Sequence, residues 1–80
     1  MDRDVAKIIL NATYRSGREL ADLVLFVKEH CDERDYERIS NAIATVLHDL
    51  NSTVQRPIYE EHPDIEREIE NWVERFGRTF

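Results

Sequence analysis

The chain offers few side chains of the kinds that carry chemistry, and their spacing does not favour it. His30 and Cys31 are adjacent, whereas His48 and His62 lie apart in the sequence. No C-x-x-C, H-x-x-x-H or E-x-x-H spacing occurs that would align two metal ligands on one element. Neighbouring residues on a helix point about 100° apart, so His30 is not placed to activate Cys31 as a nucleophile. We therefore expect no metal, no cofactor and no enzymatic activity.

Other function classes are disfavoured by motif and composition. The serines lie outside any G-x-S-x-G context, and two glycines are too few for a phosphate-binding loop. A net charge of −6 and an isoelectric point near 4.9 disfavour direct binding to nucleic acid, which requires a basic face. The longest apolar run, residues 23–27, is far shorter than the roughly 20 residues that span a bilayer. We expect neither a nucleic acid nor a membrane as partner.

The negative charge is concentrated in residues 60–74, whose net charge of −6 equals that of the whole chain. Glu66, Glu70 and Glu74 recur every four residues, so a helix would place them in one stripe, at a mild cost in repulsion. This stripe either keeps the protein soluble or binds a basic partner. For the second case the predicted acidic patch comprises Glu60, Glu61, Asp64, Glu66, Glu70 and Glu74. The first 18 residues are basic by contrast, so the two segments could pair within the fold or across a dimer.

Composition and periodicity predict an all-α fold in a single domain, residues 1–80. Few glycines and prolines favour a few long helices. Apolar residues at helical spacing predict a first helix over about residues 3–31. Its apolar sector is formed by Val5, Ile8, Ile9, Ala12, Leu20, Leu23, Val24, Val27 and Cys31. As an alternative, the capping box Ser16-Gly17-Arg18-Glu19 would begin a new helix at Gly17 and give a four-helix bundle.

Local signals predict two further helices. Asp32 or Asp35 can cap a helix over about residues 35–55, which we expect to end ahead of Pro57. Residues 58–61 are then a connector. Pro63 at the first helical position and Gly77 as the C-terminal cap define a helix over about residues 63–76. The expected architecture is a long helical hairpin with a shorter C-terminal helix packed across it.

Four apolar residues of the first helix do not fit its apolar sector: Leu10, Tyr14, Leu25 and Phe26. They make the helix apolar on more than one side, and a small hairpin covers only one side well. We therefore predict that these four residues form an interface.

These observations favour a non-enzymatic protein–protein interaction module that self-associates, as a homodimer, through its long first helix. The alternative is a small acidic inhibitor or nucleic-acid mimic whose acidic patch occupies a basic site on another protein. A single cysteine and the lack of an apolar leader favour a cytoplasmic location.

Overall fold

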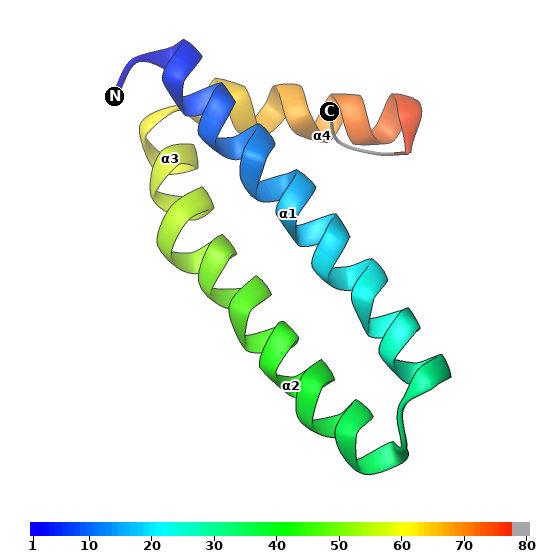
Figure 1. The fold of residues 1–80 in the computed structure, drawn as a ribbon. Coiled ribbons are helices and arrows are strands. Elements are labelled where there is room, and N and C mark those ends of the chain that lie inside the picture. The colour runs from blue at the N-terminus through cyan, green and yellow to red at the C-terminus, as the bar shows by residue number, and fades with distance from the viewer. Residues whose placement is uncertain (78–80) are drawn as a thin grey trace.

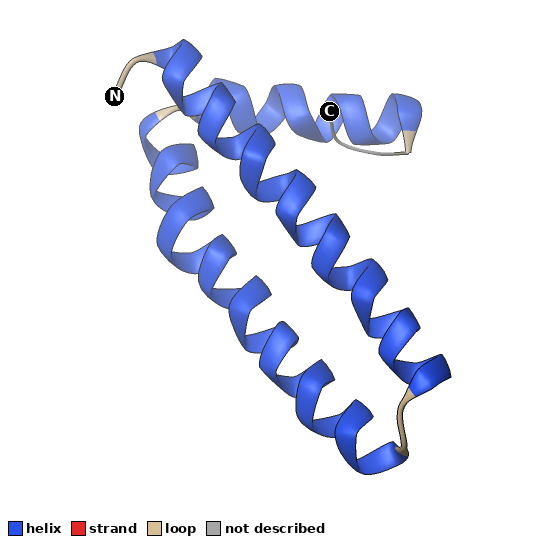
Figure 2. Ribbon diagram, viewed as in Figure 1, coloured by secondary structure: helices blue, strands red, loops and turns tan. Residues whose placement is uncertain are grey.

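The structure, a computed structural model, describes residues 1–77 and is all-α, as predicted. The elements are α1 (Arg3–His30), α2 (Glu33–Asp49), a π-helical segment η1 (Leu50–Gln55), α3 (Arg56–Glu61) and α4 (Pro63–Phe76). Helix α1 lies beside the continuous rod formed by α2, η1 and α3, and runs antiparallel to it (Figure 1). Helix α4 crosses this hairpin at the end that holds the N-terminus. Figure 2 shows short loops between the helices and no strand among the described residues.

Helix α1 is continuous through Gly17, so the alternative of a four-helix bundle broken at Gly17 is wrong. The helix is capped at its start by Asp2, whose Oδ1 accepts from the backbone N–H groups of Asp4 at 2.9 Å and Val5 at 3.1 Å. At Gly17 the helix packs against the side chain of Leu47 of α2. This packing offsets the poor helix propensity of glycine.

The second helical rod begins earlier and ends later than predicted. Asp32 rather than Asp35 is the N-cap, and its Oδ1 accepts from the Asp35 N–H at 2.8 Å. The expected end near residue 55 is wrong, because the chain stays helical to Glu61. The helix changes to π geometry just before Pro57, with the Arg56 N–H donating to the Asn51 carbonyl five residues back. A wider turn at this point accommodates a proline ring that would clash in a regular α-helix.

The bounds of α4 are as predicted. Pro63 occupies the first turn, and Gly77 ends the helix in the left-handed conformation with φ of 72°. The Gly77 N–H donates to the Val73 carbonyl at 2.7 Å.

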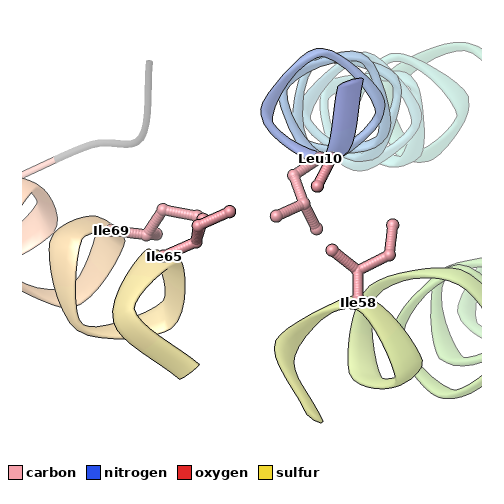
Figure 3. Close-up of a cluster of buried hydrophobic side chains, with 5 residues drawn as sticks. Leu10, Ile58, Ile65 and Ile69 are labelled. Carbon is pink, nitrogen blue, oxygen red and sulfur yellow. The ribbon is translucent and has the colours of Figure 1, made fainter. Parts of the chain in front are cut away.

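The main core cluster is small and lies at the end of the hairpin where α4 crosses, while Val27 of α1 and Ile43 of α2 are buried outside this cluster. In Figure 3, Leu10 of α1, Ile58 of α3, and Ile65 and Ile69 of α4 point toward one another. Ala6 completes this cluster, and Leu10, Ile65 and Ala6 are fully buried. The radius of gyration is 14.7 Å, against about 12 Å for a compact chain of this length. The chain is therefore elongated, and much of the hairpin lies beyond the reach of α4.

The predicted core face of α1 is partly wrong. Val5, Ile8 and Leu23 are exposed at 48%, 69% and 43%, whereas Leu10, predicted to fall outside the core, is buried. Helix α1 is apolar on two sides, and the docking of α4 selects one of them. Among the described residues, no helix has both the length and the apolar character needed to cross a membrane.

Candidate interaction surface

The side of α1 that faces away from the core carries a row of exposed apolar residues. We call it the outer stripe and define it by five residues: Val5, Ile8, Ala12, Leu23 and Phe26. At 100° per residue they fall within a sector about 60° wide. The centre of this sector, at Ala12, lies about 160° around the helix from the core residue Leu10. Neither the α2–α3 rod nor α4 therefore covers it.

The middle of the outer stripe is polar. Ser16 and Glu19 lie within or next to the same sector and are exposed, and Arg15 lies at its edge, also exposed. Arg15 and Glu19 are one turn apart on the helix. The stripe thus has an apolar patch at each end, separated by a short charged and polar stretch.

The structure separates the four residues of the predicted interface. Leu10 is fully buried in the core, so its assignment to an interface is wrong. Tyr14 is half-buried and packs against the same core, which raises the pKa of its hydroxyl through burial and the nearby Glu66. Leu25 and Phe26 are exposed at 63% and 57%. Being neighbours, they point about 100° apart and belong to different surfaces.

Phe26 is the largest side chain of the outer stripe. Its ring lies 4.5 Å from that of His30, one turn further along α1. His30 is exposed, so this pair forms a broad aromatic surface at the C-terminal end of the stripe.

A hollow of about 290 Å³ lies on the other side of the hairpin, between α1 and the α2–η1 rod. Gly17, Ala21 and Leu47 contribute to its apolar lining. The polar lining residue Gln55 is buried and satisfied within the chain. Its Nε2 donates to Thr13 Oγ1 at 3.0 Å, and its Oε1 accepts from Asn51 at 3.3 Å. The hollow therefore holds a structural polar bridge rather than a set of groups aimed at a ligand.

The acidic segment divides into paired and unpaired carboxylates. Arg3 binds Asp64 at 2.8 Å and Glu68 at 2.9 Å, and Lys7 binds the other oxygen of Glu68 at 2.8 Å. Hydrogen bonds from these cations lower the carboxyl pKa values of Asp64 and Glu68. The basic start of α1 and the acidic α4 thus pair within the fold, one of the two predicted possibilities.

The predicted acidic patch is consequently smaller than its six residues. Glu61 pairs with the N-terminal amino group, which lowers the pKa of its carboxyl group, and Asp64 is held by Arg3. The remaining members are exposed and form no ion pair within residues 1–77: Glu60, Glu66, Glu70 and Glu74.

Helix α4 also exposes part of its apolar face. Its first half is buried through Ile65 and Ile69, but its second half extends past α1 (Figure 1). Trp72, Val73 and Phe76 are 43%, 40% and 52% exposed as a result. The Trp72 and Phe76 rings lie 4.9 Å apart.

The remaining reactive side chains do not converge. Cys31 is exposed at the end of α1, which corrects the expectation that it lies on an apolar helix face in the core. Within residues 1–77, no group of three or more His, Cys, Asp or Glu side chains could hold a metal ion. The chain has no significant match to a protein-family model, a curated protein or a solved structure. No residue role is therefore carried over from a relative.

Proposed function

We propose that this chain is a non-enzymatic protein–protein interaction module that self-associates through the outer stripe of α1. The observation that supports this proposal is the exposure of Val5, Ile8, Leu23 and Phe26 on one side of a single well-capped helix. Isolated exposed apolar residues are ordinary on a protein surface, but a row of them along one helix face marks a contact surface.

The shape of the molecule supports the same proposal. A domain is usually built from at least two packed layers, each burying the apolar face of the other. Here α4 supplies a second layer at one end of the hairpin only. A second copy on the outer stripe would cover the side of α1 that the chain itself leaves in water.

The test is the solution mass, measured by light scattering after size exclusion, of wild type and of Phe26→Asp. The matched control is Leu25→Asp, because Leu25 is the adjacent residue, is similarly exposed, and lies off the outer stripe. We expect a wild-type dimer that persists at high salt, a monomeric Phe26→Asp variant and a dimeric Leu25→Asp variant. A monomeric wild type at every concentration and salt would refute the proposal, as would equal effects of the two substitutions.

The alternative proposal, an acidic inhibitor of a basic site, is supported by Glu66, Glu70 and Glu74, which remain exposed. It is weakened by the pairing of Glu61 and Asp64 within the chain. Exposed charges are screened within about 8 Å at physiological ionic strength, so such a complex should dissociate as salt rises. Reversal of the three glutamates to lysine separates the proposals, since it should leave a dimer formed through α1 intact.

A further inference from the structure

We propose that two copies of this chain pair their α1 helices antiparallel, with the outer stripe of each facing that of the other about a twofold axis between residues 15 and 16. This inference rests on the proposed function and specifies its partner and geometry.

The spacing of the outer stripe is symmetric along the helix. Val5 and Phe26 lie equally far from a point between residues 15 and 16, and so do Ile8 and Leu23. A twofold contact requires a self-complementary surface, in which residue i meets residue j and j meets i. In the antiparallel arrangement Val5 meets the partner's Phe26, and Ile8 meets the partner's Leu23. The apolar patch at each end of one stripe is then covered by the opposite patch of the other.

The polar centre of the stripe fits the same register. Glu19 and Ala12 are also equally far from the axis, so Glu19 meets the smallest residue of the opposite stripe. The partner's Arg15 then lies about 4.5 Å from Glu19 along the axis, from three residues at 1.5 Å each. Each Glu19 therefore lies near two arginines, its own Arg15 and the partner's Arg15, both on the side of Glu19 that faces the twofold axis. The four charges at the centre of the interface sum to zero.

A parallel pairing would not satisfy these groups. It would place Glu19 beside the partner's Glu19 as well as Arg15 beside the partner's Arg15, and like charges facing each other are unfavourable. In the antiparallel register only the two Arg15 residues lie near each other, because the two Glu19 residues are about 10 Å apart along the axis. The antiparallel contact also leaves the core untouched, since Leu10 and α4 lie on the opposite side of α1.

Short cross-links between introduced cysteines test the register. Cys31 is exposed and is first replaced by serine, giving a background without thiols. Ile8→Cys and Leu23→Cys are then made separately and treated with a short bis-maleimide, alone and as an equimolar mixture. In the proposed register the two different cysteines face each other, whereas identical cysteines lie about 22 Å apart along the axis, from fifteen residues at 1.5 Å each.

We expect a covalent dimer from the mixture and none from either variant alone, with Cys31→Ser itself dimeric by light scattering. Cross-linking of either variant alone, or a dimeric mixture that does not cross-link, would overturn the register but leave self-association standing. A monomeric Cys31→Ser protein alongside a dimeric wild type would also overturn it, because Cys31 lies outside the proposed contact. A monomeric wild type would overturn both this inference and the proposed function.

Discussion

Substitution of Gly17 by alanine tests whether glycine is required in the middle of α1. A Cβ atom on residue 17 would lie 3.5 Å from Leu47 Cδ2, which is an ordinary van der Waals contact. The residue lies inside a continuous helix and does not have a positive φ angle, so alanine adopts its conformation without strain. Alanine is favoured over glycine in a helix interior by about 1 kcal/mol.

We therefore expect Gly17→Ala to raise the free energy of unfolding by about 1 kcal/mol, and Tm by about 4–8 °C for a domain of this size. Urea and thermal denaturation followed by circular dichroism measure both quantities. The control is Ala44→Gly, at an exposed position inside α2, which should lose a similar amount. Because residue 17 faces α2 rather than the outer stripe, the dimer affinity should not change.

A destabilised Gly17→Ala variant would refute this reasoning. It would mean that Leu47 cannot accept the added methyl group, and that glycine is kept for close approach of α1 to α2. A stable variant with lost self-association would instead contradict the assignment of the interface to the outer stripe.

Three further predictions follow from the core, the ion pairs and the interface. Leu10→Ala should lower the free energy of unfolding by about 2–5 kcal/mol, because it removes a fully buried core side chain; a loss below about 1 kcal/mol in urea denaturation would contradict its place in the core. The fold lowers the carboxyl pKa values of Asp64 and Glu68 below their ordinary values of 3.8 and 4.5. The contribution of these two carboxylates to the free energy of unfolding is therefore present above the ordinary values and is lost as the pH falls through the lowered ones. The pH dependence of unfolding in that acid range should be flatter in Lys7→Gln than in wild type, and an unchanged slope would argue against the pair with Glu68. Arg15→Glu and Glu19→Arg should each weaken the dimer, and the two together should restore it; additive losses in sedimentation would show that these charges do not meet.

Sequence signals of short range located most of the helix ends. Asp32 caps α2, Pro63 lies in the first turn of α4, and Gly77 ends it. Such signals are local, since each depends on the backbone groups of one or two turns. The exception is Pro57, which the sequence alone treats as a helix end. The π turn before it keeps the rod helical, and its Gln55 is held by Thr13 from α1, a contact distant in sequence.

The candidate interface was predicted only in part. The sequence predicted that α1 is apolar on more than one side and that Phe26 lies in an interface, and Phe26 is indeed exposed. The prediction that Leu10 belongs to the same interface is wrong, because Leu10 is buried. Residues 10 and 26 lie about 160° apart around the helix, which periodicity already shows. What periodicity could not show is which of the two apolar sides the chain would bury.

The sequence by itself therefore determined that the protein is all-α, where most of its helix ends lie, and that α1 has more apolar surface than one contact can cover. Only the tertiary structure decided which side of α1 became core and which became the outer stripe. The reason is that both sides are apolar, so burial energy alone scarcely distinguishes them. The side that became core is the one on which Arg3 and Lys7 bind Asp64 and Glu68, more than 60 residues away in the chain. There α4 covers Leu10, whereas Phe26 on the other side stays exposed.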